Sequence, residues 1–138
     1  MLSFKKGRFG SAKIQKNLKD INKLNSEIFT FQGKITDLLE KSCKVIIFYR
    51  NEYPIGIAIT RWLRSQQISY LLNFGITPTF QNKGYGKMLW KELCEECDHY
   101  FRLEVEPSRS RAINFYEKMG ATRMKIKGDF IHMLYVDF

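Results

Sequence analysis

Between a β-like run and a helix-like run, the chain reads Gln81-Asn82-Lys83-Gly84-Tyr85-Gly86. The β-like run extends from Ile68 to Ile76, and the helix-like run from Lys87 to His99. Gly84 and Gly86 let the backbone approach a ligand without an intervening Cβ, and the free N–H groups of a starting helix point toward a bound anion. The stretch therefore predicts a pyrophosphate-binding loop. In the alternative interpretation, the glycines only make a strand-to-helix turn.

Three strands are expected up to this loop. Lys44 to Arg50, Ile55 to Leu63 and Ile68 to Ile76 are rich in β-branched and aromatic residues. Asn51 to Pro54 supplies a turn between the first two runs. Because the connections are short, we expect an antiparallel meander.

After the loop, we expect a helix from Lys87 to His99 and a strand from Phe101 to Val105. A strand, a crossover helix and a second strand imply one parallel pair. The residues of this helix expected to face the sheet are Met88, Leu89, Trp90, Leu93 and Cys97.

The last third of the chain predicts a helix and a hairpin. The helix extends from Ser110 to Met119, with Gly120 as its C-terminal cap. The hairpin joins Thr122 to Lys127 with Phe130 to Val136 through Gly128-Asp129. This order of elements predicts an α+β fold with a mixed, mostly antiparallel sheet flanked by helices.

The N-terminal part is expected to be helical. Apolar residues recur three or four apart from Ala12 to Phe29, and a shorter helical stretch extends from Thr36 to Lys41. Residues 1–36 carry +6 of the net charge of +9. This basic N-terminal face is interpreted as a solvated surface, with attraction to RNA or an acidic partner as the alternative.

The composition bounds the class of protein. A chain of 138 residues that is 44% hydrophobic suits one domain, residues 1–138. The sequence predicts a cytoplasmic protein without a membrane span or secretory signal. Cys94 and Cys97 have C-x-x-C spacing, but they fall inside a helix without a second pair, so we expect packing side chains and no metal site.

Two separated motifs resemble one family, the GCN5-related N-acetyltransferase (GNAT) superfamily. The loop matches its glycine motif at Gln81, Gly84 and Gly86. A second stretch, from Ala112 to Ala121, looks like that superfamily's helix with its Tyr and Gly. The resemblance covers residues 44–138 as a cofactor-binding core. Residues 1–43 fit the family's variable helical N-terminal part, without a standard first strand.

The resemblance implies transfer of an acetyl group from acetyl-coenzyme A (acetyl-CoA) to a primary amine by direct attack. Tyr116 matches the position that protonates the leaving thiolate, and Glu104 matches a base. Glu106, or a water positioned by Asn73, is an alternative base. In the alternative interpretation of Glu104, this residue is only ion-paired or solvated and has no catalytic role. Backbone amides near Phe74, Gly75 and Ile76 are expected to hold the pantetheine arm and polarise the thioester carbonyl.

The remaining expected cofactor-binding residues surround the glycine motif. Amides from Asn82 to Lys87 are expected to bind the pyrophosphate, with charge added by the side chains of Lys83 and Lys87. Arg109 stands where family members often have Asn. The full set expected to contact acetyl-CoA is Phe74, Gly75, Ile76, Gln81, Asn82, Lys83, Gly84, Tyr85, Gly86, Lys87 and Arg109.

The acceptor is left open among a peptide N-terminus, a small-molecule amine and an aminoacyl-tRNA. The alternative function is a non-catalytic module that binds acyl-CoA, or that docks RNA or protein through the basic N-terminal face. Tyr116 favours the enzyme, because a binding module needs no phenol at that position. Both a monomer and a homodimer paired through Phe130 to Phe138 are compatible with the sequence.

Overall fold

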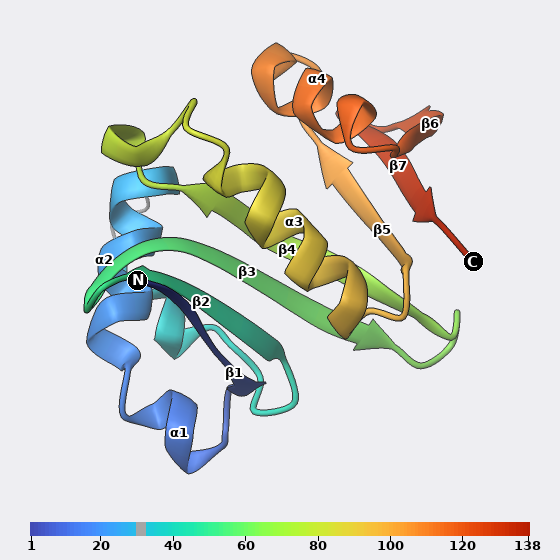
Figure 1. The fold of residues 1–138 in the computed structure, drawn as a ribbon. Coiled ribbons are helices and arrows are strands. Elements are labelled where there is room, and N and C mark those ends of the chain that lie inside the picture. The colour runs from blue at the N-terminus through green and yellow to red at the C-terminus, as the bar shows by residue number, and fades with distance from the viewer. Residues whose placement is uncertain (30–32) are drawn as a thin grey trace.

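The computed structural model describes residues 1–29 and 33–138. Its centre is a seven-stranded sheet in the order β1-β2-β3-β4-β5-β7-β6 (Figure 1). Only the β4–β5 pair is parallel. The predicted α+β class, with a mixed and mostly antiparallel sheet, is therefore confirmed.

The element bounds follow the hydrophobic pattern closely. The strands are β1 Leu2–Arg8, β2 Lys44–Arg50, β3 Tyr53–Leu63, β4 Ile68–Ile76, β5 Tyr100–Val105, β6 Thr122–Lys127 and β7 Phe130–Val136. The helices are α1 Ala12–Gln15, α2 Leu18–Phe29, α3 Tyr85–Glu96 and α4 Ser110–Lys118, with short 3₁₀ turns η1 Ile35–Asp37 and η2 Pro78–Phe80. The predicted meander, crossover and terminal hairpin are confirmed.

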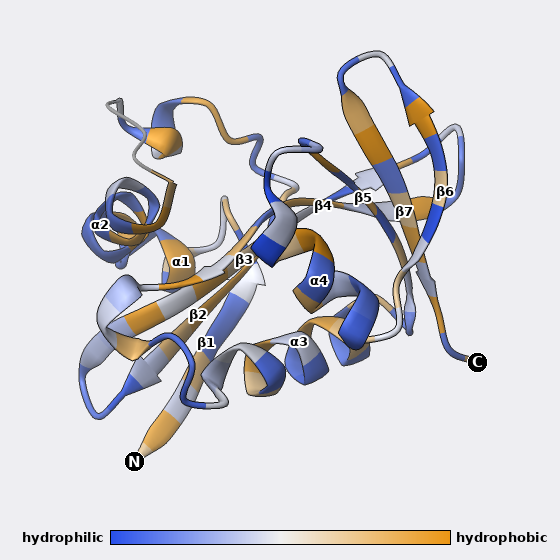
Figure 2. Cartoon of the chain, turned by 90° about the horizontal axis from the view of Figure 1, so that it is seen from above, coloured by the Kyte–Doolittle hydropathy of each residue, from blue (hydrophilic) through white to orange (hydrophobic). Residues whose placement is uncertain are grey.

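Helices cover the two faces of the sheet unequally (Figure 2). On one face, α3 and α4 bury the larger core, in which Phe48, Phe101 and Leu93 are fully enclosed. On the other face, α1 and α2 cover a second core that includes Ile47 and Ile57. This second core draws its strand residues from β2 and β3. The alternation of apolar residues along β2 serves both cores.

The N-terminal segment corrects the sequence prediction, because Leu2–Arg8 forms a strand. β1 pairs with β2 along its whole length, from Leu2 opposite Arg50 to Arg8 opposite Lys44. Lys6 Nζ lies 2.5 Å from Glu92 Oε1 and 2.9 Å from Glu96 Oε1, so this lysine ties β1 to α3. Part of the basic N-terminal charge is thus structural.

Three helix predictions are also corrected. The predicted helix from Ala12 to Phe29 is broken near Asn17, whose side-chain amide donates to the carbonyl of Lys13 at 2.8 Å and competes with the backbone ladder. The predicted helix from Thr36 to Lys41 is only the short turn η1. Helix α3 begins two residues before Lys87 and ends at Glu96, three residues before His99. Met88 is 43% exposed instead of facing the sheet.

Candidate active site

The parallel pair β4–β5 separates partway along its length. Pairing joins Ser69, Tyr70 and Leu71 to Phe101, Arg102 and Leu103. Beyond these pairs, β4 continues to Ile76 and β5 to Val105 without pairing to each other, and Figure 1 shows the two strands diverging beside α3 and α4. The split opens the sheet between two strand ends.

The divergence leaves backbone amides of β4 free to meet a ligand. The N–H of Thr77 donates to the carbonyl of Ile55 at 2.8 Å, so this end of β4 bonds to β3 through every second residue. Gly75 is opposite Ile57, two residues before Thr77, so its backbone N–H and C=O groups also face β3. The N–H groups of Phe74 and Ile76 therefore point away from β3, toward the split.

A bulge shapes the strand just before these amides. Asn73 is opposite Ile59, whereas Leu71 is opposite Thr60, so Leu72 has no partner on β3. Bulges increase local twist and redirect side chains, and Leu72 is accordingly exposed. The bulge therefore lies directly after the last pair between β4 and β5, Leu71 with Leu103.

The loop after β4 presents backbone N–H groups at the start of α3. The Gln81 side-chain amide donates to the carbonyl of Ile76 at 2.9 Å, which fixes the loop to the end of β4. Asn82 and Gly84 adopt positive φ angles of 60° and 86°. Gly84 is the N-cap, and no side chain caps the helix. The first N–H groups of α3 are thus available to an anion.

The split and the loop border a cavity of about 520 Å³. Its walls come from β4, the glycine loop, α4 and the end of α2. The predicted site residues on its surface are Phe74, Gly75, Ile76, Gln81, Asn82, Arg109 and Tyr116. Arg111 also lines it, and its guanidinium donates to Asn82 Oδ1 at 3.5 Å. We refer to this space as the long cavity.

A smaller hollow of about 200 Å³ adjoins the long cavity. Phe74, Arg109 and Tyr116 border both spaces. The hollow also contains Asn73 and Glu104. Phe74 and Tyr116 belong to the core under α3 and α4. Asn73 is opposite Ile59, and cross-strand partners share a face, so Asn73 lies on the other face with the second core. The hollow therefore passes through the split from one face of the sheet to the other.

Tyr116 lies at the junction of the two spaces. Its side chain is only 8% exposed and packs against the rings of Phe74 and Trp90. Burial raises the pKa of its phenol above the ordinary value, and the charge of Arg109 opposes this shift. The phenol therefore remains protonated at neutral pH and has a proton to donate.

Glu104 is held by several polar neighbours. Arg102 Nη2 lies 3.7 Å and His132 Nε2 lies 3.4 Å from Glu104 Oε1. Glu104 also contributes, after burial, to raising the pKa of the Tyr70 phenol. Arg102 Nη2 is 3.2 Å from His132 Nδ1, an arrangement that fits the His132 tautomer with its proton on Nε2. Glu104 is thus both ion-paired and positioned in the hollow.

The site's residues and fold match a known family. The Acetyltransferase (GNAT) family model matches residues 16–121, which is more than half of the chain. The chain belongs to the GNAT acetyltransferase family. No curated protein sequence matches it significantly. The predicted membership of this family is therefore confirmed.

Solved GNAT structures share the fold along nearly the whole chain. The ribosomal-protein-S18-alanine N-acetyltransferase from Escherichia coli has a TM-score of 0.80 at 19% identity, covering 100% of this chain and 96% of its own. The paia N-acetyltransferase from Thermoplasma acidophilum, in complex with coenzyme A, has a TM-score of 0.75 at 14% identity, covering 97% of this chain and 98% of its own. Arabidopsis thaliana Naa50, in complex with the bisubstrate analogue CoA-Ac-MVNAL, has a TM-score of 0.68 at 19% identity, with 99% of each chain covered.

The residues of this GNAT chain fit an acyl-CoA in the long cavity. Coenzyme A requires an anion site for its pyrophosphate and a narrow channel for its pantetheine arm. The uncapped start of α3 has amides for the anion, and a Cβ at Gly84 would have no heavy atom within 4 Å. Arg109 and Arg111 add positive charge on the opposite wall. Phe74 and Ile76 of β4 line the same cavity.

Other predicted residues have structural roles in this GNAT fold. A Cβ at Gly75 would collide with Ile28 of α2, and a Cβ at Gly86 would lie 3.3 Å from Phe115 of α4. The Tyr85 ring packs edge-on against Phe48 and Phe80, so it belongs to the packing beneath the loop. Both glycines therefore permit close packing of neighbouring elements.

Three charged candidates lie at the surface. Lys83 and Lys87 are exposed, on the loop and the first turn of α3. Glu106 is exposed beyond the end of β5 and lines neither the hollow nor the long cavity. The geometry therefore brings Glu104, and not Glu106, beside Tyr116.

Sequence reasoning missed the residues that α2 contributes. Ile28 lines the long cavity and Phe29 lines the hollow, at the C-terminal end of this helix. Their periodicity predicts burial but does not indicate which strand they meet. Among the described residues, 1–29 and 33–138, no cluster of three His, Cys, Asp or Glu side chains suited to metal binding occurs. None of the helices in these ranges is long and apolar enough to span a membrane.

Proposed function

We propose that the protein transfers an acetyl group from acetyl-CoA to a primary amine of an acceptor. The observation that carries this proposal is the position of Tyr116, which borders both the long cavity and the hollow. One space accommodates the acetyl donor and the other admits the amine. Two reactants that meet at one buried proton donor are what direct transfer requires.

Acetyl-CoA is placed with its pyrophosphate at the start of α3. The amides of residues 82–87 bind the phosphates, with Lys83, Lys87 and Arg109 adding charge. The thioester then lies along β4. The free amides of Phe74 and Ile76 donate to the carbonyl oxygen and stabilise the negative charge that develops there.

Proton transfer follows from the two titratable side chains. The incoming ammonium loses one proton to Glu104, directly or through a water held by Asn73, and becomes a nucleophilic amine. A C–N bond forms and the C–S bond breaks. The Tyr116 hydroxyl donates its proton to the departing thiolate, and the second amine proton restores the phenol. Glu104 supports this role because it lies in the hollow.

The acceptor is placed on the face of the sheet away from α3 and α4. Two structural neighbours are named for peptide substrates, a ribosomal-protein alanine and a peptide linked to coenzyme A. Their likeness in fold favours a peptide amino terminus over a small amine or an aminoacyl-tRNA. The non-catalytic alternative is weaker, because a buried phenol between two spaces has no use in a pure binding module.

Calorimetric titration with acetyl-CoA, followed by a thiol-release assay on peptides, polyamines and aminoacyl-tRNA, tests the proposal. Tyr116→Phe should bind acetyl-CoA with unchanged affinity and lose at least about tenfold in transfer rate, because only the departing thiolate loses its donor. Tyr49→Phe is the matched control, since that phenol is buried in the core of the opposite face. Binding without release from any acceptor would favour the non-catalytic module.

A further inference from the structure

One half of the sheet has an uncovered face. Cross-strand partners share a face, and the pairings Glu104–His132 and His132–Lys125 put these three side chains together. Their neighbours Leu103 and Met133 point the other way, into the core under α3 and α4. Over β5, β7 and β6, no helix of the described residues covers the Glu104 side (Figure 2).

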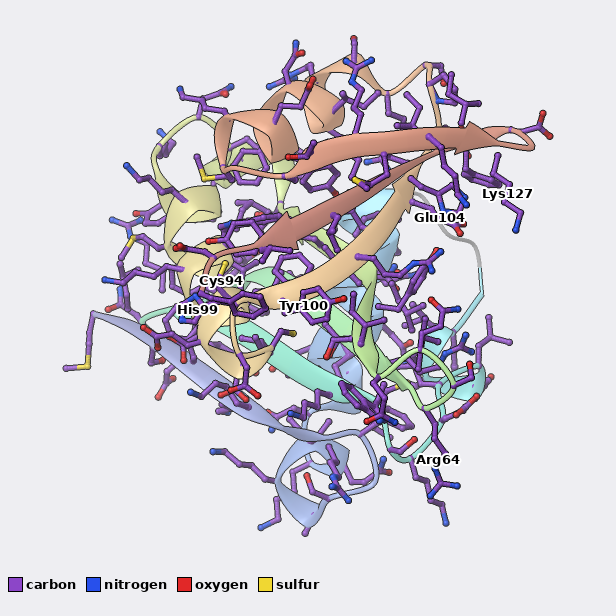
Figure 3. All side chains as sticks on the ribbon, turned by 90° about the vertical axis from the view of Figure 1, so that its right-hand side faces the viewer. Arg64, Cys94, His99, Tyr100, Glu104 and Lys127 are labelled. Carbon is purple, nitrogen blue, oxygen red and sulfur yellow. The ribbon has the colours of Figure 1, made fainter. Side chains whose placement is uncertain are left out.

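A groove of about 490 Å³ lies on this uncovered face. Its polar walls include Arg102, Lys125, Lys127 and His132, and we call it the basic groove. Ile68 and Leu134 contribute apolar floor. Figure 3 shows Lys127 and Glu104 near each other, toward the end of β5 that lies away from Tyr100.

The charges of the basic groove are incompletely balanced. Lys125 and Lys127 are exposed and have no ion-pair partner among the described residues. Arg102 has one acidic neighbour, Glu104, which it shares with His132. No carboxylate lines the groove within the described part of the chain. Such a surface attracts negative charge.

Glu104 connects the hollow with the residues of the basic groove. Glu104 lines the hollow, and its carboxylate contacts Arg102 and His132 of the groove. An amine that enters the hollow from the uncovered face meets a space lined by both Glu104 and Tyr116. The groups that follow the amine in the acceptor then lie over β7 and β6.

We propose that the acceptor is a peptide with Asp or Glu close behind its amino terminus, and that Lys125 and Lys127 select it. This inference rests on the proposed acetyl transfer. Lys125 is two strand spacings from Glu104, or about 10 Å between Cα atoms. An extended chain covers this distance in about three residues. The carboxylates are therefore expected at the third and fourth positions of the peptide.

A small acidic amine fits this arrangement less well, because it cannot occupy the hollow and reach Lys127 at the end of β6 at once. RNA also carries negative charge, but the groove has no repeated row of cations for the phosphates of an RNA strand. Among the described residues, the only lysine or arginine side chains that line the groove are Arg102, Lys125 and Lys127. A short acidic peptide segment matches both the size and the charge of the groove.

The test compares matched peptides in the thiol-release assay. Peptides beginning Ala-Ala-Asp-Asp, Ala-Ala-Asn-Asn and Ala-Ala-Lys-Lys are offered to the wild type and to the Lys125→Glu/Lys127→Glu variant. The wild type should favour Asp over Asn about five- to tenfold in kcat/KM, mainly through KM, with a smaller ratio at high salt. The double variant should favour Lys. The control variant Lys13→Glu/Lys16→Glu has the same change of net charge, but its substitutions lie in α1 and at the C-cap of that helix. It should keep the preference for the Asp peptide.

The outcomes separate this inference from the proposed function. Equal rates with Asp and Asn peptides, with acetyl-CoA binding and transfer intact, would overturn the acidic specificity alone. Transfer only to small amines or to aminoacyl-tRNA would overturn the peptide acceptor. Failure of the wild type to bind acetyl-CoA would overturn both proposals. An Asp preference that both double variants abolish equally would show an effect of net charge and overturn the role of the groove.

Discussion

At Gly84 the backbone has a φ of +86°, and a Cβ built there would meet no heavy atom within 4 Å. Because a side chain would have room here, the positive φ angle, and not close packing, is the reason for a glycine at position 84. A β-branched residue is unfavourable at positive φ, so the loop must rearrange to accept one. The amides at the start of α3 would then move from the positions in which they face an anion.

We therefore expect Gly84→Val to weaken acetyl-CoA binding at least about tenfold. Strain should also lower the free energy of unfolding by about 1–2 kcal/mol. Gly128→Val is the matched control, because Gly128 has a φ of +62° and equally open surroundings in the β6–β7 turn. It should lose similar stability and keep its affinity. Normal binding by Gly84→Val in calorimetry would place the pyrophosphate elsewhere.

Single residues of the site are predictable where their signal is local. The glycine loop and the Tyr116 helix have spacings that depend on a few consecutive residues, and the structure puts Gln81 and Tyr116 on the same cavity. The bulge at Leu72 has no such signal, because it exists only in the register between β4 and β3. The exposed Lys125 and Lys127 likewise gain meaning only from their neighbours across the hairpin.

At the scale of elements, the C-terminal end of α2 is positioned by Gly75. A Cβ at this glycine would collide with Ile28, and the Phe29 ring lies 3.5 Å from the same point. The close approach brings Ile28 to the long cavity and Phe29 to the hollow. Sequence periodicity predicts an amphipathic helix here, but the contact with β4 is a tertiary one.

We expect Gly75→Ala to lower the free energy of unfolding by about 1–3 kcal/mol, because the added methyl group overpacks the contact with α2. Adding Ile28→Ala should restore part of this loss by vacating the space, although Ile28→Ala alone is expected to be destabilising. Urea denaturation of the four proteins in this double-mutant cycle measures the coupling. Additive effects of the two substitutions would contradict the proposed contact.

The first strand shows why other elements escape prediction. In β1, the partly buried Phe4 ring stacks on Phe48, while Lys5 and Lys6 occupy the centre of the strand. An edge strand is held by backbone pairing with β2 and by the polar contacts of these lysines. Its sequence therefore lacks the apolar alternation that revealed β2 and β3.

At the scale of the whole molecule, several buried or half-buried phenols link stability to alkaline pH. Burial and a hydrogen bond to Glu104 raise the pKa of Tyr70 to about 12. Burial, followed by a hydrogen bond to Asp20, raises the pKa of Tyr49, and burial also raises that of Tyr116. An unfolded tyrosine titrates near pKa 10, so the folded protein binds more protons above this pH.

Because the folded state keeps protons that the unfolded state loses, stability should be nearly constant from about pH 7 to 9 and fall as the pH rises above about 10. Each phenol contributes at most about 1.4 kcal/mol per pH unit to the slope. Urea denaturation at several pH values measures the curve. In Tyr49→Phe, which removes a buried phenol from the core under α1 and α2, the curve should fall less steeply between about pH 10 and 12. Parallel curves for the variant and the wild type would show that Tyr49 titrates alike in both states, contrary to the effect expected of its burial and its bond to Asp20.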